Sequence, residues 1–356
     1  MTDEPKAKGK GKGKKTIMTT KSGKGLDVGT SFVVLAAEQD DGSIQYRDIR
    51  DAFYVIKPAT PIAAKMIEKG LTGRTFVKTS KGSFVIIGKD AIEKAVERNE
   101  SVKRPMYRGV LSSKEKDARK ILSYILKEAA GEASVPGEKI VFCIPAQPID
   151  QGEDEFDVGY HEDVVKTVLV ELGYTPKAIN EAEALCYAEL EKDDYTGICL
   201  SFGAGMVNVC VMLNGEVITT FATTKSGDWI DRMSAVATGQ TDSVVQTEKE
   251  SGEFTIGESN DNQILAAVSA YYERLIDYTT KQLSATLSAH KDFPKFKEPL
   301  TIVVGGGTSQ AKGFVECFSK KLEENSFPGE VKEVRLASDC LHGVAKGCLI
   351  ASQILE

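Results

Sequence analysis

Three glycine-containing turns, each directly after a short apolar run, constrain the fold of this chain more than any other feature. They lie in "LDVGTS" (residues 26–31), "SFGAG" (201–205) and "VVGGGTS" (303–309). Because glycine has no Cβ, backbone N–H groups in such a turn can approach an anion closely. The first two turns also share a context, since each lies between an apolar strand and a returning strand. This repetition predicts a duplicated α/β architecture in which each half contains a mixed sheet.

Taken singly, each turn is also typical of an ordinary hairpin. Two other phosphate-binding motifs would give a stronger local signal. The sequence has no G-x-x-x-x-G-K-[ST] motif, which argues against a P-loop NTPase. It also lacks the complete strand, G-x-G-x-x-G and helix signature of a dinucleotide-binding fold. "GGGTSQAKG" precedes an expected helix, but it lies late in the chain and lacks the downstream carboxylate that binds ribose. The order of the three turns is therefore the stronger signal.

Length and composition indicate a globular chain of two domains. The 356 residues are 41% hydrophobic and 27% charged, and a domain takes roughly 100–200 residues. No apolar run approaches the ~20 residues that span a bilayer, and the N-terminus does not resemble a signal peptide. We therefore expect a cytoplasmic protein without a transmembrane segment. The seven cysteines stand singly, mostly in apolar runs, which is typical of reduced and buried thiols, and the three distant histidines argue against a histidine metal site.

The charge is distributed unevenly along the chain. Residues 1–24 contain eight lysines and two acids, so their net charge is +6. Because the whole chain has a net charge of −7, the remaining residues carry −13. The segment "PKAKGKGKGKK" has nothing to bury and is predicted to be disordered. Such a tail can serve only as a solubilising segment, or it can bind an anionic membrane surface or nucleic acid by charge. The acidic body does not otherwise suggest nucleic-acid binding.

The order and spacing of the turns resemble the actin-like ATPase superfamily. This superfamily includes the actins, the bacterial rod-shape, plasmid-segregation and magnetosome actins, the seventy-kilodalton heat-shock chaperones and the sugar kinases. The matching segments, in chain order, are the first phosphate loop "LDVGTSFVVLA", the first connecting segment "VFCIPAQP", the glutamate-bearing "AINEAEALCYAEL", the second phosphate loop "LSFGAGMVNVCVM", "KSGDWIDRM", the adenosine loop "TIVVGGGTSQAKGF" and the second connecting helix "ASDCLHGVAKGCLIAS".

The resemblance implies a duplicated actin-like, ribonuclease-H-like α/β ATPase fold with two halves around a nucleotide cleft. The domains expected from it are a disordered basic tail (1–24), domain I (25–158) with a small insertion subdomain at about 57–104, domain II (159–334) with a helical subdomain at about 226–298, and a C-terminal helix (335–356) that returns to domain I.

The resemblance also implies a site that binds ATP or ADP with Mg²⁺. Asp27 would orient the hydration shell of Mg²⁺, which prefers carboxylate oxygens and keeps several waters. Glu181 would position or deprotonate the attacking water. Both residues have simpler interpretations, Asp27 as a turn residue and Glu181 as an acid favoured at a helix N-terminus.

The remaining implied nucleotide-binding residues come from all the matching segments. They are Gly29, Thr30 and Ser31 in the first phosphate loop, Ser201, Gly203, Ala204, Gly205 and Asn208 in the second, Asp228 in "KSGDWIDRM", Gly305, Gly306, Gly307 and Thr308 over the adenosine and α-phosphate, and Glu248 with Lys249 facing the ribose or adenine. A charged pair on a helix is usually a solvated face, so the last two have an ordinary alternative.

The second phosphate loop departs from the superfamily pattern. An Asp usually opens it, but this chain has Ser201, and the Thr-Asp that usually closes it is Val207-Asn208. One of two metal-orienting carboxylates is thus missing, and Asp27 would do most of the Mg²⁺ positioning. We expect ATP hydrolysis to be slow, or lost with binding retained.

The length leaves no room for the substrate-binding domain of a chaperone, and no sugar-binding carboxylate is recognisable. We therefore expect a prokaryotic filament-forming actin whose subunits associate with one another head to tail. Such contacts do not close into a ring and so give a filament. The alternative is a non-polymerising, nucleotide-dependent switch or chaperone-like ATPase.

Overall fold

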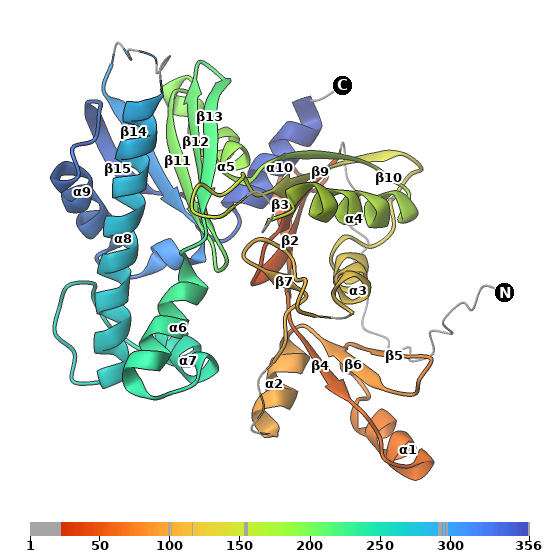
Figure 1. The fold of residues 1–356 in the computed structure, drawn as a ribbon. Coiled ribbons are helices and arrows are strands. Elements are labelled where there is room, and N and C mark those ends of the chain that lie inside the picture. Colours follow the sequence, from red (N-terminus) through yellow and green to blue (C-terminus); the bar gives the residue numbers. More distant parts are fainter. Residues whose placement is uncertain are drawn as a thin grey trace.

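The computed structural model describes residues 23–354, apart from residues 99, 101, 116, 153–155, 291–293, 295 and 297. Two halves, each built on a five-stranded sheet, lie side by side (Figure 1). The predicted disordered tail falls almost wholly outside the described residues. Its last member, Lys24, is instead the first residue of a strand, where its buried ammonium pairs with Glu138 at 3.2 Å. The ordered fold thus begins before residue 25.

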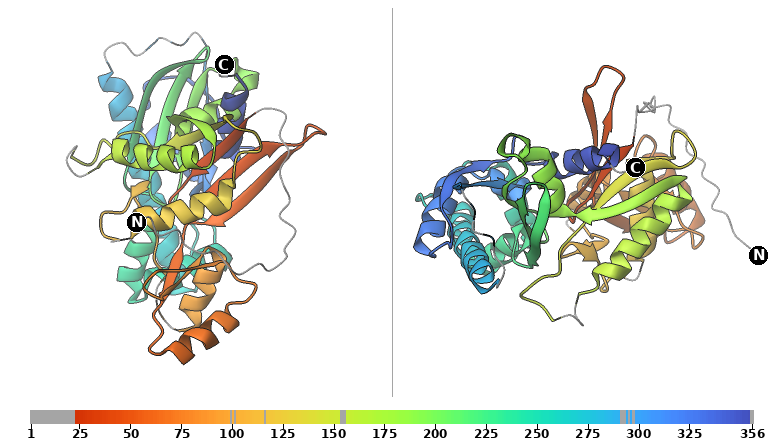
Figure 2. Two further views of the ribbon diagram at one scale, coloured as in Figure 1. Left: turned by 90° about the vertical axis from the view of Figure 1, so that its right-hand side faces the viewer. Right: turned by 90° about the horizontal axis from the view of Figure 1, so that it is seen from above.

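The sheet of the first half has the strand order β10-β9-β1-β2-β3. Its strands are β1 (Lys24–Val28), β2 (Phe32–Glu38), β3 (Ile44–Arg50), β9 (Glu138–Ile144) and β10 (Tyr174–Asn180). The first three pair antiparallel, and β9 and β10 run parallel to β1. Helices α3 (Ala118–Ala130) and α4 (Val158–Glu171) pack against this sheet through their apolar stripes. Figure 2 shows the β2–β3 hairpin extending away from the rest of the half.

A small lobe is inserted between β3 and α3. Its three-stranded sheet has the order β4-β6-β5 and is covered by short helices. The elements are β4 (Phe53–Ile56), α1 (Pro61–Gly70), β5 (Phe76–Lys78), β6 (Phe84–Ile87) and α2 (Lys89–Glu97), followed by the two-stranded ribbon of β7 (Met106–Tyr107) and β8 (Val110–Leu111). The lobe begins at Phe53, a few residues before the start of the insertion subdomain proposed from the sequence.

The sheet of the second half has the strand order β13-β12-β11-β14-β15. Its strands are β11 (Gly197–Phe202), β12 (Val207–Leu213), β13 (Glu216–Thr223), β14 (Leu300–Gly305) and β15 (Val331–Leu336). The helices of this part of the chain are α5 (Glu181–Glu189), η2 (Glu191–Asp193), α6 (Gly227–Thr238), α7 (Asp242–Ser251), α8 (Gln263–Ala289), η3 (Gly307–Gln310), α9 (Phe314–Glu324) and α10 (Gly343–Ile354).

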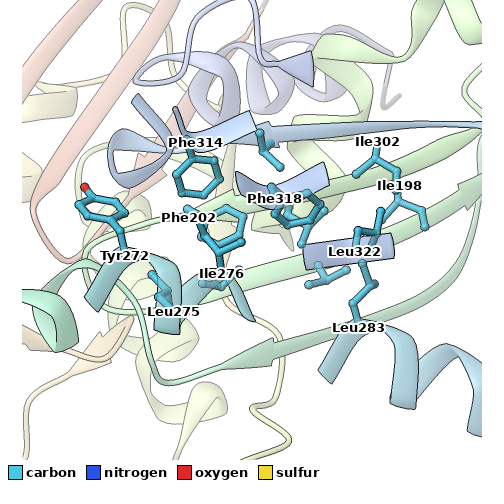
Figure 3. Packing of buried hydrophobic residues seen from close by; sticks show 14 of the residues in the cluster. Ile198, Phe202, Tyr272, Leu275, Ile276, Leu283, Ile302, Phe314, Phe318 and Leu322 are labelled. Atoms are coloured by element: carbon cyan, nitrogen blue, oxygen red, sulfur yellow. The ribbon is translucent and has the colours of Figure 1, made fainter. Parts of the chain in front are cut away.

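The central strands β11, β12 and β14 of the second sheet are buried on both faces, which explains their continuous apolar runs. Along β11, Ile198 and Phe202 face α8 and α9, whereas Cys199 faces α5 and α10. The α8–α9 side is the largest core, in which Phe202 meets Phe314 edge to face with ring centroids 4.9 Å apart (Figure 3). This alternation of faces follows from the two-residue period of a strand.

The two sheets confirm the predicted duplication. In each, three consecutive antiparallel strands are extended by two parallel strands on the side of the first strand, so that β1, β2, β3, β9 and β10 correspond to β11, β12, β13, β14 and β15. One expected boundary needs correction. Because β10 completes the first sheet and α4 packs on that sheet, the first half extends to Asn180 and not to residue 158.

Helix α10 lies between the halves and approaches its neighbours closely (Figures 1 and 2). A Cβ on Gly25 of β1 would lie 2.2 Å from the Ala345 carbonyl oxygen, and one on Gly347 would lie 1.7 Å from the carbonyl oxygen of Ala184 in α5. Glycine is therefore required at both contacts. Helix α10 thus contacts β1, β2 and β9 of the first half. Within the described residues, none of the helices is long and apolar enough to cross a membrane.

Candidate functional site

A cavity of about 940 Å³ lies between the halves, and the three glycine turns all contribute to its wall. Most residues that the sequence assigned to nucleotide binding line it: Asp27, Gly29, Thr30, Ser31, Glu181, Ser201, Gly203, Ala204, Gly205, Asp228, Lys249, Gly306, Gly307 and Thr308. Segments far apart in the sequence thus meet at one site, because equivalent turns of the two sheets face each other.

Three assigned residues do not line the cavity, which corrects their assignment. Glu248 accepts a hydrogen bond from Asn262 Nδ2 at 3.1 Å, on a part of α7 outside the cavity. Gly305 ends β14 beneath Leu185 and Ala337, to which a Cβ would come within 3.0 and 3.2 Å. Asn208 is wholly buried behind Glu181.

The phosphate-loop turns are tightly packed against each other. Thr30 Oγ1 accepts a hydrogen bond from Gly109 N at 2.9 Å, and a Cβ on Gly205 would lie 2.4 Å from that hydroxyl. The N–H of Gly29 donates to the carbonyl of Phe32 at 2.9 Å. The Gly29 amide, expected to face phosphate, is therefore used within its own turn, and only glycine fits at position 205.

The Gly203 carbonyl joins the second phosphate loop to two other segments. It accepts hydrogen bonds from Ser226 Oγ at 2.5 Å and from Thr308 Oγ1 at 2.8 Å. Ser226 precedes α6, and Thr308 lies in η3 after the third glycine turn. The second turn, the third turn and the N-terminus of α6 consequently form one rigid wall of the cavity.

Two carboxyl groups, Asp27 and Glu181, face each other in the site. Burial and, after it, the nearby Asp27 charge together raise the pKa of Glu181 to about 8, against a lowering effect of its hydrogen bond with Ser201. Burial also raises the pKa of Asp27 to about 6, although the hydrogen bond from Cys143 Sγ at 3.1 Å lowers it. Two carboxylates that repel each other are stabilised by a cation between them.

This arrangement fits Mg²⁺ held largely through water and phosphate. In the part of the chain that the structure describes, no group of three or more His, Cys, Asp or Glu side chains is placed to hold a metal ion. Mg²⁺ commonly binds proteins through one or two carboxylates and keeps several waters. Asp27 supplies one such carboxylate on the cavity wall, and Glu181 lines the same cavity.

Glu181 is also the first residue of α5, the position at which an acid is favoured by the helix N-terminus. Asn180 caps this helix by accepting from the N–H groups of Ala182 and Glu183, at 2.9 and 3.3 Å. The Glu181 carboxylate accepts from Ser201 Oγ at 2.7 Å and from Asn208 Nδ2 at 2.9 Å. The Ser201 hydroxyl, at the position where an Asp is usual in the superfamily pattern, thus donates to Glu181.

Comparison with known proteins gives the family. The Volactin family model matches residues 23–352. The chain belongs to the Volactin family. No curated protein matches it.

Solved structures show the fold of this volactin. A MamK double helical filament matches with a TM-score of 0.70 and 18% identity over 94% of this chain and 99% of that one. MreB5 of Spiroplasma citri bound to AMPPNP matches with a TM-score of 0.64 and 12% identity over 93% and 96%. A non-polymerising MamK mutant bound to AMPPNP has a TM-score of 0.56 at 18% identity over 93% and 98%. These matches show that the chain has the duplicated actin-like fold.

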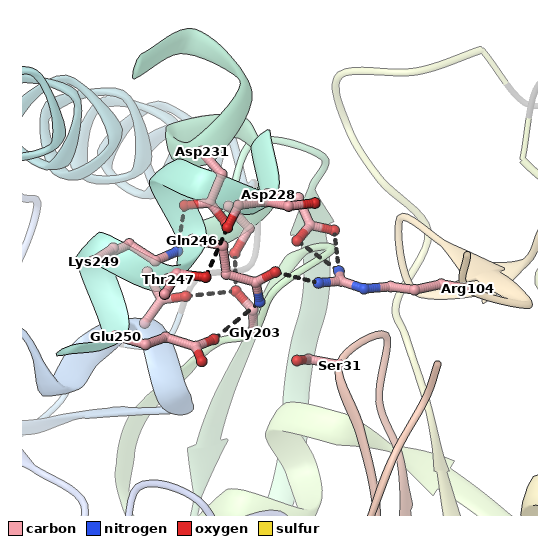
Figure 4. Close-up of polar contacts among 12 residues, drawn as sticks. Ser31, Arg104, Gly203, Asp228, Asp231, Gln246, Thr247, Lys249 and Glu250 are labelled. Carbon is pink, nitrogen blue, oxygen red and sulfur yellow. Dashed lines mark hydrogen bonds and ion pairs between the residues drawn. The ribbon is translucent and has the colours of Figure 1, made fainter. Parts of the chain in front are cut away.

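Volactin residues that sequence reasoning missed bridge the cavity from opposite sides (Figure 4). Arg104 Nη1 donates to both carboxylate oxygens of Asp228, at 2.8 and 3.0 Å, and its Nη2 donates to Gln246 Oε1 at 3.3 Å. Arg50 Nη2 pairs with Glu250 at 2.8 Å. Asp228 lines the cavity as expected, but its carboxylate is bound to Arg104 rather than open to a ligand.

No local signal marks these arginines in the sequence. Arg104 follows the inserted lobe and its partners lie on α6 and α7, so the contact exists only in the folded chain. Lys249 lines the cavity, yet its ammonium pairs with Asp231 Oδ1 at 2.7 Å, with both side chains largely buried. The sequence shows Lys249 and Asp231 only as two separate charges and does not indicate that they pair.

Proposed function

We propose that this volactin is a cytoplasmic, nucleotide-binding and filament-forming actin-like protein that hydrolyses ATP slowly. The observation that carries the proposal is the meeting of all three glycine turns and two carboxyl groups around one cavity of about 940 Å³. That volume is at the upper end of ligand pockets and accommodates a nucleoside triphosphate.

The two ends of the nucleotide would meet different parts of the wall. The phosphates would lie at the turns that contain Thr30 and Ala204, near Asp27 and Glu181. The base would lie between the α7–α8 connection and the segment after η3, where Phe254, Thr255, Gln310, Ala311 and Lys312 line the cavity. These two segments are already joined, since Ile256 N donates to the Lys312 carbonyl at 2.9 Å.

Hydrolysis would follow from the same arrangement. Water attacks the γ-phosphorus, the bond to the β–γ bridging oxygen breaks, and ADP, phosphate and a proton leave. Mg²⁺, when bound, neutralises charge on the phosphates. Asp27 would hold the hydration shell of that ion, and Glu181 would orient the water and take its proton. The neutral Ser201 at the second carboxylate position supports a slow rate.

Replacing Glu181 tests the proposed hydrolysis directly. We expect Glu181→Ala to lower the rate of phosphate release by roughly 100-fold, the usual contribution of a general base. ATP affinity should change little, because Glu181 contacts only the water in this scheme. The control is Glu183→Ala, which lies two residues further along the same helix and outside the cavity lining. Unchanged turnover in Glu181→Ala would remove the assigned role.

Filament formation is supported by the likeness to the MamK double helical filament. The full chain should enter the pellet on ultracentrifugation with ATP and Mg²⁺ and show polymers by negative-stain microscopy. A chain that stays in the supernatant at high concentration, while it binds ATP, would favour the non-polymerising switch instead.

The basic N-terminal segment would bring these polymers to an anionic surface. Residues 1–22 contain seven of the eight lysines that the sequence places at this end. Deleting residues 2–22 should reduce co-sedimentation with anionic liposomes at low salt and leave ATP binding intact. Equal co-sedimentation of both forms, with liposomes and with DNA, would leave the segment only a solubilising role.

A further inference from the structure

Asn208 is a buried amide whose two ends are both used. It lies on β12 directly opposite Ser201 of β11 and is 0% exposed. Its Oδ1 accepts from Ala146 N at 2.8 Å, and its Nδ2 donates to Glu181 Oε2 at 2.9 Å. Because a backbone N–H can only donate, the oxygen must face Ala146 and the NH₂ group must face Glu181.

Ser201 and Asn208 together form a fork around the Glu181 carboxylate. Ser201 Oγ donates to Oε1 at 2.7 Å, and Asn208 donates to Oε2. Both donors are buried, and Glu181 lines the cavity. Each carboxylate oxygen accepts one bond from the fork and keeps a further lone pair. The fork therefore fixes the orientation of the carboxyl group without using up its capacity to accept from water.

The fork also explains why both positions are neutral in this chain. An acid at position 201 or 208 would place a second carboxylate within hydrogen-bond distance of Glu181, beside the already repelling Asp27. Like charges at such separations disfavour ionisation and push the groups apart. The two departures from the superfamily pattern, Ser201 and Asn208, thus serve a single contact.

One of the two contacts of Asn208 crosses from one half of the molecule to the other. Ala146 follows β9 of the first sheet, whereas Asn208 lies on β12 of the second sheet. Glu181 begins α5, which packs on β11 and β12, directly after β10 of the first sheet. A change in the relative position of the halves would alter the hydrogen bond from Ala146 and, with it, the orientation of the Asn208 amide toward Glu181.

We infer that Asn208 is a positioning residue for Glu181, holding its carboxylate toward the γ-phosphate site only while the two halves are docked as they are here. This inference rests on the proposed ATP hydrolysis. Asn208 does not touch the nucleotide in this scheme, so it acts on the rate and not on ATP affinity.

The test uses a nearly isosteric change in the full chain. Asn208→Asp keeps the acceptor for Ala146 N but replaces the donor to Glu181 with a second acceptor. We expect single-turnover phosphate release to slow by roughly 10- to 100-fold, as for a misplaced catalytic group, with the Kd for ATP within about twofold of wild type. Asn214→Asp, the same change in an exposed turn, should behave like wild type.

A double-mutant cycle separates positioning from general damage. If Asn208 acts through Glu181, then adding Asn208→Asp to Glu181→Ala should cause no further loss of rate. Ser201→Ala, which removes the other donor and adds no charge, is a second variant that should show the same pattern. Thermal melts of every variant check that the fold is kept.

Three results would overturn the inference. They are wild-type turnover in Asn208→Asp, wild-type turnover in Ser201→Ala, or an equal loss from Asn208→Asp with and without Glu181. Failure of the proposed function has a different signature, since the wild-type chain would then not bind ATP, or would bind it and never release phosphate.

Discussion

At the scale of single residues, the site depends on the neutral groups that contact its two carboxylates. Glu181 accepts from Ser201 and Asn208, while Asp27 accepts from the Cys143 thiol. Neutral donors stabilise each carboxylate where an acid would repel it. The chain thus keeps two acids facing the cavity and surrounds them with groups that carry no charge.

Ser201→Asp tests this balance. The superfamily pattern alone suggests that the substitution restores activity, but here it would place a carboxylate where a hydroxyl now lies 2.7 Å from Glu181 Oε1. We expect phosphate release to be slower than in wild type, because the repulsion displaces Glu181. Ser201→Ala as the neutral control should lose less. Faster turnover in Ser201→Asp would mean that Ser201 is simply a defective metal-binding position.

At the same scale, sequence reasoning found the acids but not their partners. The glycine turns follow from local patterns, because each lies at the end of an apolar strand, whereas Asp27 and Glu181 were assigned through the resemblance to the actin-like superfamily. Arg104 and Cys143 could not be found, since their contacts with Asp228 and Asp27 join segments more than 100 residues apart in the chain. Glu248 was misplaced because helical spacing does not tell which side of α7 faces the cavity.

At the scale of elements, close packing of α10 joins the halves. The resemblance implied a C-terminal helix that returns to the first half, and the structure shows which glycines make this close packing possible. Gly347 allows α10 to touch the backbone of α5, and Gly25 allows it to touch β1. The expected domain boundary failed at β10, because strand pairing between distant segments leaves no local mark.

Gly347→Ala should destabilise the protein by at least about 2 kcal/mol, as overpacking does, because its Cβ would lie 1.7 Å from the Ala184 carbonyl oxygen. Gly70→Ala in α1 is the matched control, since a Cβ there meets nothing within 4 Å and alanine favours a helix. Chemical denaturation followed by circular dichroism measures both. Equal stability of the two variants would contradict the close contact.

Helix α4 brings a histidine into the core of the first half. His161 is 0% exposed, and neither ring nitrogen has a hydrogen-bond partner among the described residues. Burial lowers its pKa from 6.5 to about 4. The unfolded chain therefore binds this proton at a higher pH than the folded chain does, so folding stability from this group is complete above pH 6.5 and is lost as the pH falls toward 4.

The loss between pH 7 and 4 should be about 3 kcal/mol, the equivalent of the pKa shift. His161→Met should flatten this part of the stability profile. His342 is the contrasting case, because its hydrogen bonds with Asp339 and Asp48 raise its pKa although burial lowers it. His342→Gln should therefore not flatten the acid side. Denaturant unfolding at a series of pH values gives the comparison, and an unchanged slope in His161→Met would contradict it.

At the scale of the whole molecule, the side chains that cross the cavity connect the two halves. Arg104 binds Asp228 through two hydrogen bonds to one carboxylate, a geometry stronger than a single contact. Arg50 and Glu250 add a second bridge. A nucleotide between the halves would have to leave past these contacts, so they should set the rate of exchange more than the affinity of the closed state.

Arg104→Ala should speed nucleotide release by roughly 10-fold, the equivalent of one charge-assisted hydrogen bond. Stopped-flow displacement of a fluorescent ATP analogue measures the rate. Arg74→Ala, which breaks ion pairs with Asp90 and Glu93 within the inserted lobe, is the control for removing an arginine elsewhere. An unchanged release rate in Arg104→Ala would show that these contacts do not limit exit.

The central claim is that the space between the two sheets binds a nucleotide. Isothermal titration of the full chain with ATP and Mg²⁺ tests it most directly, alongside Ala204→Leu, which adds bulk to a residue of the cavity wall. Ala133→Leu, at a position outside that wall, serves as the control. We predict one ATP per chain for wild type and the control, and at least tenfold weaker binding for Ala204→Leu. The absence of binding to the wild-type chain, or equal binding to Ala204→Leu, would contradict the account.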